Sequence, residues 1–321
     1  MAKEKVTNVP IKENTPRPKK VRVLTKELPE KEALSPLKKL LQTSDVLLML
    51  YPKNEDGYFS ESIESKDEML VYKAFKAKKE KKESLVILLD TPGGNVYSAV
   101  KIMDTLRTVY KDITIAVPQK AKSSGTMMCC GADRLVMGPI SELGPLDKPM
   151  THPDNETAHI SALDIVKSID GLLDTAEARQ KKLAREINDE FDVPIQKSLA
   201  LASDSIAKLI SPMLCKEDGK IYNQATRLLA IAEKYGAELL TKFMLKYIEK
   251  EKLRNRIADI AVRRLVWLYP DHGFAIRRDE LRDIFFIVEN AEEIDYWEEL
   301  WNEFEQNIGS KRGKIIKFLD V

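Results

Sequence analysis

Cysteines and long apolar runs are scarce in this chain. Three cysteines in 321 residues are too few for a disulfide framework, and two of them, Cys129 and Cys130, are neighbours that cannot readily bridge each other. We therefore expect reduced thiols. No segment reaches the ~20 apolar residues that a membrane-spanning helix needs, and the N-terminus lacks the apolar stretch of a secretory signal. These absences predict a cytoplasmic protein with no membrane attachment.

Net charge is nearly absent as well. The chain has 52 Lys and Arg against 51 Asp and Glu, so no overall field attracts nucleic acid, and we expect no nucleic-acid partner. No G-x-G-x-x-G motif follows a strand, and we expect neither a cofactor nor a metal. What the chain does have is 43% hydrophobic residues, enough for a sizeable core.

Composition and hydrophobic periodicity divide the chain into distinct predicted segments. Residues 1–43 are basic and rich in proline, which predicts a disordered tail. Residues 44–160 alternate short apolar strands with amphipathic helices, as in an α/β core with a largely parallel sheet. Residues 161–284 contain long amphipathic tracts with few glycines, which predict a helical continuation of the core that serves as a lid or an interface. Residues 285–321 are predicted to be a C-terminal helical extension.

Individual elements follow from the same patterns. Strands are predicted at 46–51, 85–89, 113–117 and 134–137, and helices at 69–82, 96–110 and 123–132. A further helix is predicted over 279–304, where Trp297, Trp301 and Phe304 lie on neighbouring turns. Their spacing indicates a buried docking face.

Two short motifs point to chemistry. Strand 85–89 runs into Asp90-Thr-Pro-Gly-Gly-Asn95, and Ser123-Ser-Gly-Thr126 opens a later helix. A serine becomes a nucleophile when a base removes its proton and fixed donors stabilise the developing oxyanion. Glycines let the backbone approach a ligand, and a helix start leaves its first amides unpaired. Taken singly, each motif also fits an ordinary turn or N-cap. Together they favour acyl transfer, with peptide hydrolysis as the first candidate.

The order of these motifs resembles the Clp-protease and crotonase superfamily, in which a Pro-Gly-Gly turn precedes a Ser-x-Gly helix start. Further segments resemble the serine dehydrogenase proteinase family, a Clp-like group: Gly131-Ala-Asp-Arg-Leu-Val-Met-Gly-Pro139, Ser141-Glu-Leu-Gly-Pro-Leu-Asp147 and Tyr269-Pro-Asp-His-Gly-Phe274. The resemblance extends over about residues 44–290. It implies a repeated β-β-α spiral with a parallel sheet and a helical C-terminal region, serine endopeptidase activity on peptides or unfolded proteins, and a homo-oligomer.

The resemblance also implies site residues. The family order of Ser, Asp and His implies Ser123 as nucleophile, Asp147 as the carboxylate that orients the imidazole, and His272 as general base. The implied oxyanion hole consists of the backbone amides of Gly93, Gly94 and Ser124. Lys122 is expected at the surface or facing the substrate.

Alternatives to this assignment stay open. His152 or His159 would replace His272 if the imidazole came from the loop after Asp147. A Ser-Lys dyad, as in related signal-peptide peptidases, would use a desolvated Lys148 or Lys167 as base. A crotonase-like acyl-CoA enzyme would use the same amides for a thioester oxyanion, and a catalytically silent scaffold would keep the fold for partner binding.

Overall fold

The structure, a computed structural model, describes residues 34–54, 56–147, 149–152, 155–216, 218–308 and 313–320. The fold described here is that of the unit Ser35–Val321.

The predicted disordered tail lies outside the described residues up to position 33. For the last part of that segment the prediction of disorder is wrong, because Pro36–Thr43 forms helix α1. The hydroxyl of Ser35 caps this helix by accepting a hydrogen bond from the Lys38 amide, and Leu41 is buried. Residues 36–43 are therefore helical where composition predicts disorder.

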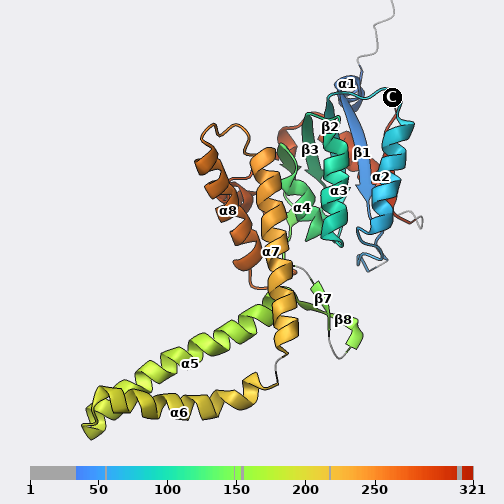
Figure 1. Cartoon of the computed structure of the whole chain (residues 1–321). Helices are drawn as coiled ribbons and strands as arrows, with labels where there is room; N and C mark the ends of the chain where they lie inside the picture. The colour runs from blue at the N-terminus through green and yellow to red at the C-terminus, as the bar shows by residue number, and fades with distance from the viewer. Residues whose placement is uncertain are drawn as a thin grey trace, which may run out of the picture. The chain divides into compact units, whose positions relative to one another are not determined.

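A six-stranded sheet forms the centre of this unit (Figure 1). From edge to edge its strands are β10 (Ile315–Phe318), β1 (Ser44–Leu50), β2 (Ser84–Asp90), β3 (Asp112–Val117), β5 (Arg134–Met137) and β9 (Val288–Asn290). All neighbours pair in parallel except β10, which runs antiparallel to β1. The predicted α/β fold with a largely parallel sheet is confirmed, and the predicted strands are β1, β2, β3 and β5.

Both faces of the sheet are covered, which explains why its strands read as continuous apolar runs. Successive side chains of β1 alternate between the faces: Leu47 and Met49 belong to one core cluster, Val46 and Leu48 to the other. The first face is covered by α2 (Ser65–Ala77), α3 (Val96–Arg107) and α4 (Ser124–Cys130), and the second by α1 and α10 (Trp297–Ile308). The site described below lies where β2 and α4 meet.

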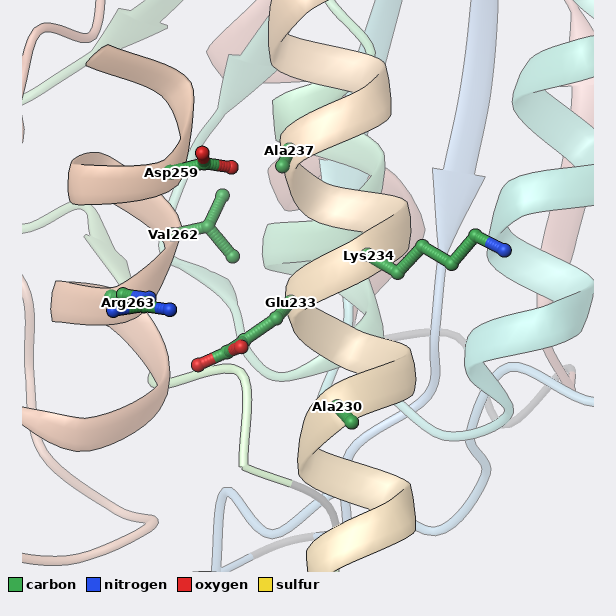
Figure 2. A pocket seen from close by; sticks show the side chains of 7 residues that line it. All are labelled: Ala230, Glu233, Lys234, Ala237, Asp259, Val262 and Arg263. Atoms are coloured by element: carbon green, nitrogen blue, oxygen red, sulfur yellow. The ribbon is translucent and has the colours of Figure 1, made fainter. Parts of the chain in front are cut away.

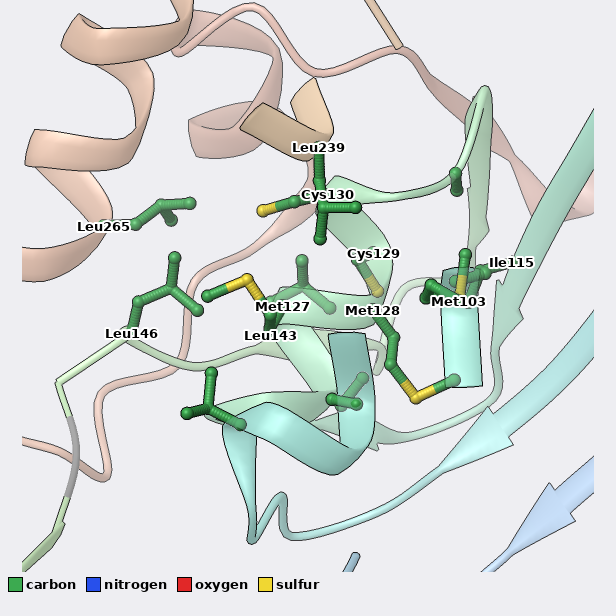
Figure 3. Packing of buried hydrophobic residues seen from close by; sticks show 14 of the residues in the cluster. Met103, Ile115, Met127, Met128, Cys129, Cys130, Leu143, Leu146, Leu239 and Leu265 are labelled. Carbon is green, nitrogen blue, oxygen red and sulfur yellow. The ribbon is translucent and has the colours of Figure 1, made fainter. Parts of the chain in front are cut away.

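Helix α4 is embedded in the first core cluster. Figure 3 shows its side chains, Met127 to Cys130, among leucines of the neighbouring segments, including Leu143, Leu146, Leu239 and Leu265. Burial raises the pKa of the Cys130 thiol to about 12, so this cysteine is an inert part of the core. A helix packed in this way gives its first residues a fixed position.

Long helices follow the sheet, as predicted. They are α5 (Ala162–Phe191), α6 (Ile195–Leu214), α7 (Gly219–Lys242) and α8 (Glu251–Trp267). In Figure 1, α5 and α6 lie side by side as a hairpin that extends away from the sheet, whereas α7 packs beside α4 and α8 packs beside α7. No helix in the described part of the chain is long and apolar enough to cross a membrane alone, but α6 and α7 pass that test as a pair bent by 81°.

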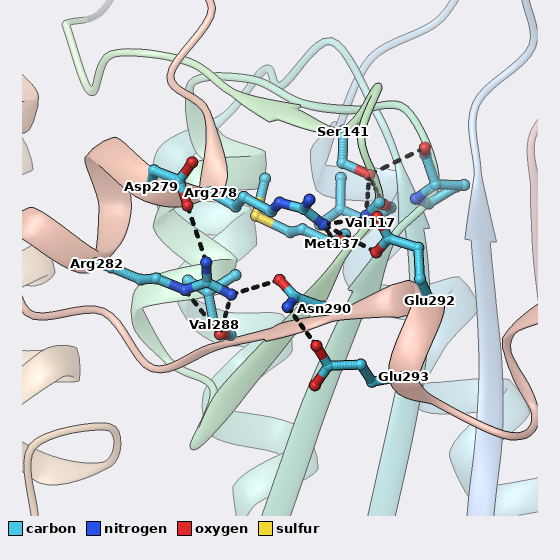
Figure 4. A network of polar contacts seen from close by, with 12 residues as sticks. Val117, Met137, Ser141, Arg278, Asp279, Arg282, Val288, Asn290, Glu292 and Glu293 are labelled. Carbon is cyan, nitrogen blue, oxygen red and sulfur yellow. Dashed lines mark hydrogen bonds and ion pairs between the residues drawn. The ribbon is translucent and has the colours of Figure 1, made fainter.

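The predicted helix over 279–304 is wrong. The segment contains α9 (Arg278–Asp283), strand β9, a short 3-10 helix (Ala291–Glu293) and the start of α10. The chain turns at Phe285, which has φ 70°, and the Arg282 guanidinium donates to the Val288 carbonyl and to Asn290 (Figure 4). The predicted helical extension over 285–321 is also corrected, because this segment contains β9 and β10 beside α10.

The predicted docking face on α10 is present. Trp297 and Phe304 are buried in the second core cluster, and Trp301 packs against it. Two small ladders complete the described strands: β4 (Lys120–Ala121) pairs with β6 (Glu142–Leu143), and β7 (Pro149–His152) pairs with β8 (Asn155–Ser161). The β4–β6 ladder brings the residues before Ser123 next to the segment that leads to Asp147.

Candidate active site

The end of β2 is held by a buried ion pair. Asp90, the last residue of the strand, lies 2.7 Å from the Lys53 ammonium, and the two side chains are 1% and 8% exposed. Its other oxygen accepts a hydrogen bond from the Lys120 amide at 2.9 Å. Burial raises the pKa of Asp90, and the Lys53 charge opposes that rise. These contacts fix the point at which the Pro-Gly-Gly turn begins.

The Gly-Gly turn requires both of its glycines. Gly93 has φ +98° and Gly94 has φ +135°, backbone conformations that L side chains rarely adopt. A Cβ at Gly94 would lie 2.3 Å from the Ile63 carbonyl oxygen, and one at Gly93 would lie 2.8 Å from the Ser123 Cβ. The turn therefore passes directly against Ser123, as the motif order predicts.

Ser123 is not an ordinary helix cap. It occupies the N-cap position of α4, but its side chain makes no capping hydrogen bond, and its backbone has φ 50° and ψ −113°. A positive φ is uncommon outside glycine and is often found at functional sites, where the surrounding structure enforces it. The residue is 7% exposed. Its hydroxyl is thus held at a helix start without serving that helix.

Two of the three predicted oxyanion donors have unpaired amides. The Gly93 N–H donates to the Thr91 hydroxyl at 3.1 Å. For Gly94 and Ser124, no acceptor of the backbone N–H is found within the described residues. Donors aimed at a developing oxyanion must be unengaged before the substrate arrives. The geometry favours Gly94 and Ser124 over Gly93 for this role.

The structure brings Asp147 and His272 together. The His272 Nδ1 lies 2.8 Å from Asp147 Oδ1, although the residues are 125 positions apart. Asp147 is 1% exposed, whereas the His272 side chain is 32% exposed. A buried carboxylate bonded to one nitrogen of a partly exposed imidazole leaves the other nitrogen available for proton transfer.

Ser161 is a site residue that sequence reasoning missed. Its hydroxyl donates to Asp147 Oδ2 at 2.6 Å, and the same oxygen caps α5 by accepting from the amides of Leu163 and Asp164 at 3.0 and 3.2 Å. A hydroxyl has one proton and two lone pairs, so with both lone pairs engaged its proton points to Asp147. The available signal was the capping pattern of a serine followed three residues later by an aspartate.

The loop after α8, residues 268–277, is fastened to the segment that carries Asp147. We call it the His272 loop. Leu143 and Ile276 exchange two backbone hydrogen bonds of 2.9 and 3.0 Å, and the Leu146 amide donates to the Leu265 carbonyl at 2.9 Å. The Asp147–His272 pair is therefore supported on both sides by backbone contacts.

Lys122, immediately before Ser123, is expected at the surface or facing the substrate, and the structure excludes the surface position. Its side chain is 13% exposed and its ammonium lies 2.9 Å from Glu142 Oε1. The ammonium also reaches the carbonyls of Gly273 and Phe274 at 3.3 and 3.0 Å, both in the His272 loop. In the described residues no hydrogen bond joins Ser123 directly to His272. Such bonds are often long in free enzymes and shorten when substrate binds.

The alternative bases have less support. Lys167 lies on an exposed face of α5, so it lacks the desolvation that a neutral lysine base requires. Lys148 lies outside the described residues, as do the side chains of His152 and His159. Over the ranges that the structure describes, no group of three or more His, Cys, Asp or Glu side chains is placed to hold a metal ion.

A small pocket of about 230 Å³ lies elsewhere, between α7 and α8. Figure 2 shows Glu233 of α7 and Asp259 and Val262 of α8 directed toward the space between these helices. The Glu233 carboxylate accepts a hydrogen bond from the Trp267 indole, so it joins the two helices. No residue of the predicted site lines this pocket.

Comparisons with known proteins find similarity to serine proteinases over part of the chain. Residues 39–172 match a family described as ClpP-like SDH-type serine proteinase. The uncharacterized protein MJ0137 of Methanocaldococcus jannaschii is 30% identical over 112 residues, which cover 33% of this chain and 38% of that protein.

Similar solved structures include two mutants of the 1510-N membrane-bound stomatin-specific protease, one of them in complex with a substrate peptide. They are 17% and 19% identical to this chain, with TM-scores of 0.28, and cover 43% of it. The matches span 63% and 60% of those two chains. The chain thus spans less than two thirds of the curated relative and of both solved chains.

The parallel sheet, the Gly-Gly turn and the serine at the start of α4 define an α/β protein. Its residues 39–172 are similar to the ClpP-like SDH-type serine proteinases, the similarity that the sequence motifs predict.

Proposed function

We propose that the chain is a serine peptidase that hydrolyses peptide bonds with Ser123 as nucleophile, His272 as general base and Asp147 as the carboxylate that orients the imidazole. The backbone amides of Gly94 and Ser124 are the proposed oxyanion donors. The observation that carries the proposal is the 2.8 Å bond between Asp147 and His272, in a loop tied to the residue before Ser123. The match of residues 39–172 to a serine proteinase family supports the reaction class.

The hydrogen-bond donors and acceptors of Asp147 and His272 support these roles. Asp147 accepts from Ser161 through one oxygen, and its other oxygen faces His272 Nδ1. A carboxylate with both oxygens acting as acceptors requires the imidazole proton on Nδ1. The Nε2 lone pair is then available to take the proton of Ser123, as general-base catalysis needs.

Ser123, His272 and the two backbone amides share the steps of the proposed reaction. Ser123 Oγ attacks the peptide carbonyl carbon while His272 Nε2 takes the serine proton, and the carbonyl oxygen becomes an oxyanion facing the amides of Gly94 and Ser124. His272 returns the proton to the leaving amine, which leaves an acyl-enzyme on Ser123. Water then attacks the ester carbonyl carbon while His272 Nε2 takes one water proton. The imidazolium returns that proton to Ser123 Oγ as the ester bond breaks, which releases the carboxylic acid and restores the serine.

The test is hydrolysis of an unfolded, fluorescently labelled protein. We expect release of peptides by the unaltered chain and none by Ser123→Ala, with Ser168→Ala as the control because this serine is exposed on α5 and outside the site. Cleavage that survives Ser123→Ala, or an inactive chain in every assembly state, would contradict the proposal.

We also propose that copies of the chain associate through the α5–α6 hairpin. Apolar side chains on this hairpin are exposed, among them Phe191 at 70%, Leu209 at 61% and Met213 at 54%. Exposed apolar groups that gather on one element mark interaction surfaces. Light scattering on Leu209→Glu should give a smaller particle than the unaltered chain, and identical masses would contradict this proposal. The cytoplasmic location stays a prediction.

A further inference from the structure

We propose that Lys122 is a positioning residue that holds the His272 loop beside Ser123. This inference rests on the proposed peptidase function, because it concerns the residue that brings the general base to the nucleophile. Lys122 is adjacent to Ser123 in sequence, yet its ammonium ends among segments that carry the other two members of the triad.

The contacts of the Lys122 ammonium connect three parts of the site. It donates to the Gly273 and Phe274 carbonyls at 3.3 and 3.0 Å, directly after His272. It donates to the Leu143 carbonyl at 3.2 Å, four residues before Asp147. It also lies 2.9 Å from Glu142 Oε1. One cation thus joins the nucleophile segment, the Asp147 segment and the His272 loop.

The methylene chain of Lys122 has a fixed course as well. A Cβ at Gly144 would lie 2.6 Å from Lys122 Cδ and 3.3 Å from its Cα, so the absence of a side chain at Gly144 is what makes room for the lysine. The side chain is 13% exposed. Burial lowers the pKa of the Lys122 ammonium, and its pairing with Glu142 opposes that effect.

This environment suits a structural cation rather than a general base. An ammonium has three protons, and Lys122 directs its donors at three carbonyl oxygens and a carboxylate. A lysine base would need a neutral amine with its lone pair facing Ser123. Four surrounding acceptors instead favour the protonated ammonium, which has no lone pair. Lys122 therefore affects the reaction by holding His272 in position.

A neighbouring lysine provides the matched control. The Lys120 ammonium is near the same carboxylate, 3.9 Å from Glu142 Oε1, but its side chain is 47% exposed. In the described structure no hydrogen bond joins it to the His272 loop. Lys120→Met removes the same charge near Glu142 without touching the contacts to Gly273 and Phe274.

The first arm of the test is the rate at which a fluorophosphonate labels Ser123. We expect Lys122→Met to slow labelling by on the order of 10²-fold, the effect of displacing a catalytic group by about 1 Å. Lys122→Arg should retain part of the rate because arginine keeps the donors but cannot act as a base. Lys120→Met should label like the unaltered chain. Equal rates in Lys122→Met and Lys120→Met, or complete loss in a folded Lys122→Arg, would overturn the inference.

The second arm separates positioning from general damage. If Lys122 acts through His272, adding Lys122→Met to His272→Ala should cause no further loss of labelling. A further loss as large as the one that Lys122→Met causes in the otherwise unaltered chain would contradict the inference.

The third arm does not depend on activity. The chain has three histidines, so imidazole resonances in ¹H–¹⁵N spectra can be assigned to His272 with the His272→Ala variant. We expect the Nδ1–H signal of His272 to shift or broaden in Lys122→Met and to stay unchanged in Lys120→Met. An unchanged signal in Lys122→Met would overturn the inference even if the unaltered chain labels normally. If the unaltered chain does not label, the proposed function fails, but this spectrum still decides whether Lys122 positions His272.

Discussion

Asp147→Asn is the most informative single change, because two hydrogen bonds constrain what the new amide can do. Asp147 accepts from Ser161 through one oxygen and faces His272 Nδ1 with the other. The Ser161 oxygen already accepts from two backbone amides, so it has no lone pair for an amide NH₂. The NH₂ of the new asparagine would therefore turn toward His272.

That orientation reverses the histidine tautomer. An NH₂ group facing Nδ1 needs an acceptor there, so the imidazole proton moves to Nε2 and the base loses the lone pair that Ser123 requires. A tautomer reversal in a serine protease triad lowers turnover by about 10⁴-fold. At about 1.4 kcal/mol per decade this corresponds to roughly 5.5 kcal/mol of transition-state stabilisation. The folded state should lose only about 1–3 kcal/mol, the usual cost of a disturbed buried hydrogen bond.

The assay is the second-order rate of fluorophosphonate labelling, paired with urea unfolding of the same samples. Asp164→Asn is the matched control, since this aspartate is exposed in the first turn of α5. We expect a loss of about 10⁴-fold for Asp147→Asn and none for Asp164→Asn. A folded Asp147→Asn protein that labels within tenfold of the unaltered chain would refute the assignment of Asp147.

Other predictions test the supports of the site and of the sheet. Ser161→Ala removes both the α5 cap and the bond to Asp147, so its unfolding free energy in urea should fall by about 3 kcal/mol, and a change under about 0.5 kcal/mol would contradict this role. Gly94→Ala combines a positive φ with a Cβ 2.3 Å from the Ile63 carbonyl, which should cost about 3 kcal/mol or more in the same assay; an unchanged midpoint would show that the turn can relax. Phe304→Ala, at a residue 1% exposed in the second core cluster, should lower stability by about 3–5 kcal/mol by calorimetry without changing the labelling rate per folded molecule.

The sheet was largely predictable because its central strands are buried on both faces. β2 and β3 are short apolar runs bounded by charged or turn residues, a pattern that burial imposes directly on composition. β9 has three residues and β10 has four, and each joins the sheet beside a strand that is distant in sequence. Strands this short contain too few residues to show a recognisable hydrophobic pattern in the sequence.

The residues of the site also fall into two groups, those that local motifs predict and those that meet only after folding. Ser123 and the two glycines stand in local motifs, so their adjacency follows from a strand and a helix start. Asp147 and His272 came from the resemblance, because nothing local predicts a contact across 125 positions. The roles of Lys122 and Ser161 depend on which carbonyls and carboxylate surround them after folding, and a lysine before a serine looks like a surface residue in the sequence alone.

The most direct test of Ser123 as nucleophile and His272 as base is the intact mass of the protein after reaction with a fluorophosphonate at neutral pH. We expect one added phosphonyl group on the unaltered chain, mapped to Ser123 by peptide sequencing, and none on Ser123→Ala. We also expect His272→Ala to label orders of magnitude more slowly. A folded chain that takes up no label in any assembly state, or that labels equally fast without His272, would contradict these roles.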